Sequence, residues 1–213
     1  RDGWPRALVS MGGLLAPPLL GAFILSHLAV HLFALAGPQA HLDALDAVQW
    51  TYRNPVVETL LVLAILTQIV TGARRLRLRN ISGWALAQVV SGAYLIMFLI
   101  VHTSAALYTH HIYGLETDFY WSAGSMHFDP IRYGFALYYF GAIVAVFTHI
   151  GAAVRFGWPA APRPLPVALP AFGAGVAAAI IAAFWGLLYP IEIGPEVEAY
   201  YETYFGIFGV SGG

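Results

Sequence analysis

The stretch FILSHLAVHLF, residues 23–33, decides the fold class, because it places two histidines inside a run of apolar residues. The run continues on both sides and is long enough to cross a lipid bilayer, which takes about 20 apolar residues in a helix. An ionisable side chain is costly inside hydrocarbon, so it marks a functional site by default. His27 and His31 are therefore the first candidate site residues.

The composition extends this membrane interpretation to the whole chain. Of its 213 residues, 59% are hydrophobic and 10% are charged, whereas soluble domains carry roughly 25% charged residues. The formal net charge of −1 excludes a basic surface for nucleic acid. The chain has no cysteine, which excludes thiolate metal sites and iron–sulfur clusters held by this chain alone.

Five apolar runs are long enough to span a membrane. They cover residues 13–36, 55–74, 84–109, 133–155 and 167–189, with short connections between them. We therefore predict an all-α integral membrane bundle of five transmembrane helices over residues 1–190. Residues 191–213 are expected to form an acidic, aromatic tail on the outer face.

The distribution of arginine predicts the orientation of the chain. Eight of the ten arginines fall at the N-terminus or in the second and fourth connections, and only Arg53 and Arg132 fall on the opposite side. The N-terminus is therefore expected in the cytoplasm and the C-terminus outside. The eight are Arg1, Arg6, Arg74, Arg75, Arg77, Arg79, Arg155 and Arg163.

His102, on the third span, is expected at the same depth as His27. Both lie roughly 10–14 Å below the outer surface at 1.5 Å per helical residue. Two neutral imidazoles from different helices can bind one metal ion between them; the alternative is that each is a hydrogen-bonded packing residue. His31 lies one turn further out. Small residues leave room for a planar haem here: Gly21, Ser26, Ala29, Ser91, Gly92 and Ala93.

The other histidines divide between the two faces. Four of them fall near the outer surface and are expected to be solvated, with a peripheral metal site as the alternative: His41, His110, His111 and His127. His149, on the fourth span, lies near the cytoplasmic end, at the depth expected for Gln68 on the second span.

This pattern resembles the five-helix, two-haem cytochrome b membrane anchor of succinate:quinone oxidoreductases and fumarate reductases. LGAFILSHLAVHLFA, residues 20–34, resembles the first ligand segment, WALAQVVSGAYLIMFLIVH, residues 84–102, the third, and VFTHIGAAVRF, residues 146–156, the fourth. The second segment resembles a His-x-x-x-Gly motif, with Gln68 in place of the histidine and Gly72 following.

The resemblance implies a haem b with His27 and His102 as axial iron ligands and His31 at the haem edge. Gln68 and His149 then form a degenerate inner site, so we expect one haem and not two. His149 should hydrogen-bond to a neighbour, because an unpaired polar group in hydrocarbon costs several kcal/mol.

Glu58, just inside the outer end of the second span, has two interpretations. The resemblance implies an acceptor of protons from quinol. The alternative is an interfacial carboxylate that is favoured by the helix dipole.

The resemblance further implies a subunit that carries electrons between a succinate or fumarate enzyme and membrane quinone. Its partners would be membrane lipid and the flavoprotein and iron–sulfur subunits on the cytoplasmic face, and its location the bacterial cytoplasmic membrane. The alternative is a non-catalytic scaffold subunit of a larger respiratory or photosynthetic complex, because Gln68 interrupts the two-haem path.

Overall fold

The structure is a computed structural model that describes residues 3–75 and 82–210, and side chains within 15–74 and 82–210. Every regular element in these ranges is helical. In chain order they are α1 (Gly3–Phe33), η1 (Ala34–Ala36), α2 (Pro38–Tyr52), α3 (Pro55–Arg75), α4 (Gly83–Tyr108), η2 (Thr109–Tyr113), α5 (Phe119–Gly124), α6 (Ile131–Gly157), α7 (Leu165–Phe184), α8 (Pro195–Phe205) and η3 (Gly206–Phe208).

Five segments are long and apolar enough to cross a membrane. They are Leu15–Ala36, Pro55–Arg74, Gly83–Tyr113, Ile131–Gly157 and Leu165–Phe184. The prediction of an all-helical chain with five candidate spans is confirmed. The predicted orientation is not tested by the fold, and Arg1, Arg77 and Arg79 lie outside the described residues.

The fifth span is shorter than predicted, because α7 ends at Phe184 and not near residue 189. Gly186 has a φ of +80°, a left-handed conformation that glycine adopts readily and that commonly terminates helices. The amides of Gly186 and Leu187 donate to the carbonyls of Ala183 and Ala182 at 3.1 and 3.0 Å. The apolar run continues past this turn, so hydrophobicity alone extends the helix too far.

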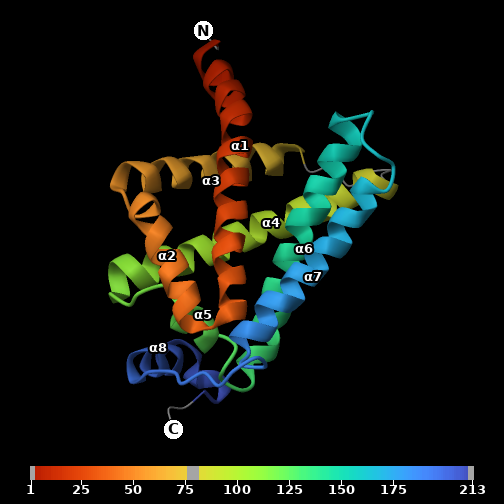
Figure 1. Ribbon diagram of the computed structural model, residues 1–213. Helices are drawn as coiled ribbons and strands as arrows, with labels where there is room; N and C mark the ends of the chain where they lie inside the picture. Colours follow the sequence, from red (N-terminus) through yellow and green to blue (C-terminus); the bar gives the residue numbers. More distant parts are fainter. Residues whose placement is uncertain (1–2, 76–81, 211–213) are drawn as a thin grey trace.

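The long helices pack as a chain of neighbours. The most extensive packing is between α6 and α7, followed by α4 with α6 and α1 with α3. In Figure 1, α3 and α4 run across α1 rather than alongside it, whereas α6 and α7 lie side by side. The comparison of depth between His27 and His102 assumed that the spans run parallel. Because α4 crosses α1, equal depth alone does not show whether the two side chains meet.

Two glycines let neighbouring helices approach closely. An added Cβ at Gly173 on α7 would lie 2.6 Å from the Cβ of Phe147 on α6. One at Gly141 on α6 would lie 2.5 Å from the hydroxyl oxygen of Tyr94, which donates to the Tyr138 carbonyl at 2.9 Å. Small residues at helix contacts are typical of membrane proteins, because close packing there stabilises association.

Three short helices cover the end of α1 that lies opposite the N-terminus (Figure 1). The chain reverses at Gly37, whose φ of +120° favours glycine, and α2 returns against α1. Helix α5 contacts α2, α7 and α8. Tyr200 and Tyr201 of α8 are buried there against Leu115 and Trp121. These short helices enclose the candidate site.

Candidate functional site

Four histidines gather where α1, α2 and α4 meet beneath α5. His27 and His31 come from α1, His41 from α2 and His102 from α4. The ring centroids of His27 and His31 are 4.4 Å apart, and those of His31 and His41 are 5.2 Å apart. The structure therefore brings the predicted site residues His27, His31 and His102 together and adds His41 to them.

The rings of His27 and His102 come from different helices, and their centroids are 6.2 Å apart with planes inclined at 60°. Imidazole nitrogens lie about 2 Å from a bound metal, so two axial imidazoles have centroids roughly 6 Å apart. Each ring is backed by a phenylalanine four residues earlier, Phe23 at 5.6 Å and Phe98 at 4.9 Å. The spacing fits one metal shared between two imidazoles.

His41, His31 and His27 form a continuous chain of hydrogen bonds. His31 Nδ1 shares one with His41 Nε2 at 3.0 Å, and His31 Nε2 shares one with His27 Nε2 at 3.1 Å. Both ring nitrogens of His31 are thus used. Because a neutral imidazole has one donor and one acceptor nitrogen, the chain has a direction that the tautomer of His31 sets.

The expectation that His41 is solvated is wrong. Its side chain is 1% exposed and lies against Phe119 and Phe184. Burial, and then the nearby His27, lower the pKa of His41 to about 4, so the ring is neutral at physiological pH. Because the chain reverses at Gly37, the face of α2 that carries His41 lies against α1. The sequence did not indicate this, because the segment was expected to be a solvated loop.

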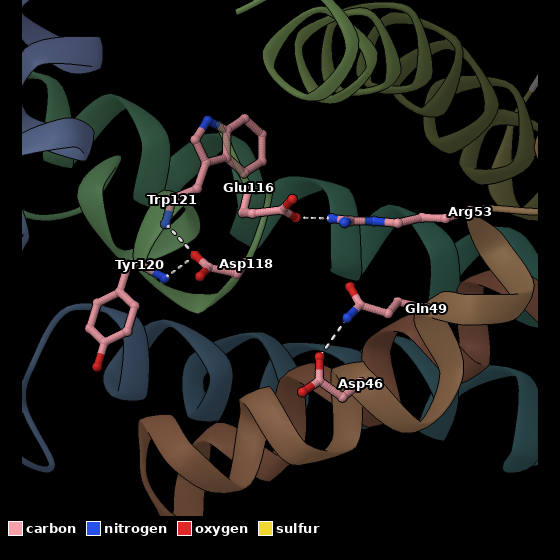
Figure 2. Close-up of polar contacts among 7 residues, drawn as sticks. All are labelled: Asp46, Gln49, Arg53, Glu116, Asp118, Tyr120 and Trp121. Carbon is pink, nitrogen blue, oxygen red and sulfur yellow. Dashed lines mark hydrogen bonds and ion pairs between the residues drawn. The ribbon is translucent and has the colours of Figure 1, made fainter. Parts of the chain in front are cut away.

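Helix α5 covers the site with two aromatic side chains, Phe119 toward His41 and Trp121 toward His102, whose ring centroid is 6.4 Å from that of Trp121. Asp118 caps the helix by accepting from the amides of Tyr120 and Trp121 at 2.8 and 3.2 Å (Figure 2). Burial raises the pKa of Asp118, an effect that these two hydrogen bonds oppose.

Trp121 is also held from α8, because the Tyr201 hydroxyl donates to its carbonyl at 2.7 Å. Two polar ring atoms at the site remain buried without a partner among the described residues, Trp121 Nε1 and His41 Nδ1. A buried unpaired donor costs about 1–3 kcal/mol. Trp121 could not be singled out from the sequence, because it lies in an aromatic connection outside the spans.

The donor set fits a haem better than a bare metal ion. Within residues 15–74 and 82–210, no three histidine or carboxylate side chains converge to hold a metal ion. Two neutral imidazoles at axial spacing, in apolar surroundings, are what a b-type haem iron requires. The unpaired Trp121 Nε1 and His41 Nδ1 match the need of haem carboxylates for buried donors.

No hydrogen bond among the described residues joins the inner pair, Gln68 and His149. Helix α3, which carries Gln68, packs mainly on α1 and α4, whereas α6, which carries His149, packs on α4 and α7. His149 Nδ1 and the Ser91 hydroxyl are 3.2 Å apart and share a hydrogen bond, so the expectation that His149 bonds to a neighbour is confirmed. An added Cβ at Gly92 would lie 3.3 Å from His149 Cε1, so the room at Gly92 is filled by this ring.

Glu58 lies in the first turn of α3, at the edge of a groove of about 340 Å³. His111 Nε2 lies 2.6 Å from the Glu58 carboxylate and donates to it. Arg53 lines the same groove but pairs with Glu116 (Figure 2), and the hydrogen bond from Arg53 lowers the pKa of Glu116. Sequence reasoning singled out Glu58 but not its partner, because His111 comes from η2, far along the chain.

Over the residues that the structure describes, these features define a helical chain with five segments able to cross a membrane and a cluster of four histidines, of which His41 is fully buried. No family model, curated protein or solved structure matches it.

Proposed function

We propose that this chain is the haem b membrane-anchor subunit of an electron-transfer complex of the succinate:quinone oxidoreductase type. The observation that supports it is the 6.2 Å separation of the His27 and His102 ring centroids, on two different apolar helices. His27 and His102 would hold the haem iron, and a haem held there would supply one-electron chemistry.

The side chains around the two ligands have separate tasks. Phe23 and Phe98 stack on the ligand rings at 19° and 18° and fix their planes. Trp121 Nε1 and His41 Nδ1, which are buried without a partner among the described residues, would donate to the carboxylates of a bound haem. His31 keeps a hydrogen-bonding partner in His41 when His27 binds the metal. The surroundings and the hydrogen bonds of the ligand histidines would set the potential of a haem held there.

The same proposal also assigns the partner subunits of this chain and the face of the membrane on which each binds. The arginine-rich side faces the cytoplasm of a bacterium and carries the flavoprotein and iron–sulfur subunits, while the outer end of α3, at Glu58, receives the headgroup of a membrane quinone. Glu58 accepts protons that the quinol releases. The cysteine-free chain needs such partners, because it cannot hold an iron–sulfur cluster itself.

A reduced-minus-oxidised visible spectrum of the purified chain tests the proposal. We expect the α-band of a low-spin haem with two imidazole ligands, and its loss in His102→Ala. His127→Ala, which changes an exposed histidine outside the cluster, is the matched control and should keep the band. A spectrum without a haem band, from cells supplied with haem, would contradict the proposal.

One observation favours a second function, a non-catalytic scaffold. His27 Nε2 already shares a hydrogen bond with His31 at 3.1 Å, so the chain of three imidazoles is satisfied in part without a cofactor. In a scaffold the cluster would only join α1 to α2, and the purified complex would contain no haem bound to this subunit.

A further inference from the structure

A second groove, of about 390 Å³, opens on the surface of the α4 and α6 spans. Its lining comes from three places in the chain: Val101 of α4, the first turns of α6, and Phe205 and Phe208 at the ends of α8 and η3. Phe205 packs edge to face on Phe135 of α6, with ring centroids 5.5 Å apart. None of the residues that line the groove carries a charge, so the groove favours an apolar ligand.

The groove follows α6 inward from its first turn. Its lining on α6 has the spacing of one helix face: Ile131, Gly134, Phe135 and Tyr138. From Ile131 to Tyr138 the helix rises about 10 Å, beginning at one end of a segment that can cross the membrane. The Tyr138 hydroxyl donates to the Phe98 carbonyl at 3.4 Å, so this polar group already has a partner. A hydrocarbon chain that runs along the span fits this course.

Arg132, next to Ile131 in the first turn of α6, has no close anionic partner among the described residues. Its guanidinium lies over the ring of Trp185, 4.0 Å from the ring centroid, and its side chain is 22% exposed. Nε is buried without a hydrogen-bond partner in the described part of the chain. The Asp129 carboxylate lies 4.0 Å from Nε and is 67% exposed, which is too far for a hydrogen bond. A cation that can still accept an anion therefore lies at the end of α6 where the groove begins.

We propose that this groove and Arg132 together bind one anionic phospholipid, with an acyl chain along α6 and the headgroup phosphate at the Arg132 guanidinium. Arginine is well suited to phosphate because it presents several N–H donors in one plane, and basic side chains at the membrane surface attract anionic lipids. The bound lipid would also join the end of α8 to α4 and α6, because Phe205 and Phe208 line the groove. The inference requires neither haem nor quinone, so it is independent of the proposed function.

Lipid titration of the purified full chain in detergent, followed by native mass spectrometry, tests the proposal. The probes are palmitoyl-oleoyl-phosphatidylglycerol, which is anionic, and the zwitterionic phosphatidylcholine with the same acyl chains. We expect the first phosphatidylglycerol to bind about fivefold more tightly than phosphatidylcholine, the effect of one arginine near an anionic headgroup. Arg132→Gln should remove this preference, and inorganic phosphate should not displace the bound phosphatidylglycerol.

Gly134→Leu should weaken the binding of both lipids about tenfold, because its side chain would occupy the groove in place of buried methylene groups of the lipid. An added Cβ at Gly134 meets no atom within 4 Å, so the fold accommodates the change. The matched controls are Gly175→Leu on α7, where a Cβ also meets open space, and Arg155→Gln in the last turn of α6. Both controls should bind the two lipids as the wild type does.

Equal affinity of the wild type for the two lipids would overturn the proposal, and this comparison needs no variant. Unchanged binding in Gly134→Leu would overturn it as well, because the lipid would then contact the spans as it contacts any apolar surface. Displacement of phosphatidylglycerol by inorganic phosphate would assign Arg132 to a free anion instead. A wild-type dimer that Gly134→Leu dissociates would show that a second copy of the chain occupies the groove, which also contradicts the proposal.

Discussion

At the scale of single residues, the account depends on buried polar atoms and the partners they find. Matched depth by residue count led to the expectation that His27 and His102 meet, and their ring centroids do lie 6.2 Å apart, but that reasoning assumed parallel spans, whereas α4 runs across α1 (Figure 1). The roles of His41 and Trp121 could not be predicted, because these residues lie on short helices. The orientation of those helices depends on the reversal at Gly37 and on contacts with α8.

His41 should make the stability of the chain depend on pH. In the unfolded chain its pKa is near 6.5, whereas burial lowers it to about 4 in the fold. The unfolded state therefore binds a proton first, and stability falls as the pH decreases from about 6.5 to about 4. The loss from this residue reaches up to about 3 kcal/mol, because one pKa unit corresponds to about 1.4 kcal/mol.

Thermal unfolding of wild type and His41→Phe in detergent, at pH 7 and pH 4.5, measures this effect. The variant should have the lower Tm at pH 7, because it leaves His31 Nδ1 without its partner, but it should lose less stability on acidification. His127→Phe should behave as the wild type does. A difference between wild type and His41→Phe that is the same at both pH values would refute the assignment.

At the scale of elements, a helix cap and an exposed ion pair near the site differ in how much they stabilise the short helices. The Asp118 cap of α5 holds the helix that places Phe119 and Trp121 over the histidines. The nearby ion pair of Arg53 with Glu116 joins two connections, but the Glu116 side chain is 62% exposed. Exposed ion pairs contribute little, at most about 1 kcal/mol, whereas loss of a helix N-cap typically costs about 1 kcal/mol.

Asp118→Ala should therefore loosen α5 more than Glu116→Gln does. The amides of Tyr120 and Trp121 lose their acceptor in the first variant and keep it in the second. Hydrogen exchange of peptides covering residues 117–126 should accelerate about fivefold or more in Asp118→Ala, in line with the loss of about 1 kcal/mol. Equal protection in the two variants would show that packing alone holds α5 in place.

At the scale of the whole molecule, long apolar runs predicted five spans but not how they cross. The apolar run continues after Phe184, so hydropathy does not reveal the turn at Gly186. Hydropathy also does not distinguish α3 and α4, which run across α1, from α6 and α7, which pack side by side (Figure 1). Crossing depends on which small residues meet, as at Gly141 and Gly173. The orientation across the membrane remains a prediction from the arginines.

Single cysteines test this orientation cleanly, because the chain has no native cysteine. In intact cells a membrane-impermeant thiol reagent should label Glu196→Cys on α8 and leave Arg77→Cys unlabelled until the membrane is opened. Labelling of position 77 from outside, with position 196 protected, would reverse the assignment of the two faces.

Haem stoichiometry in paired ligand variants tests the central claim, that His27 and His102 together hold one haem, most directly. The measurement is pyridine haemochromogen per mole of purified chain, for wild type, His27→Ala, His102→Ala and the control His149→Ala, whose ring bonds to Ser91 instead. We predict one haem in the wild type and in His149→Ala, and none in the other two variants. Two haems in the wild type, or one haem that survives in both His27→Ala and His102→Ala, would contradict the account.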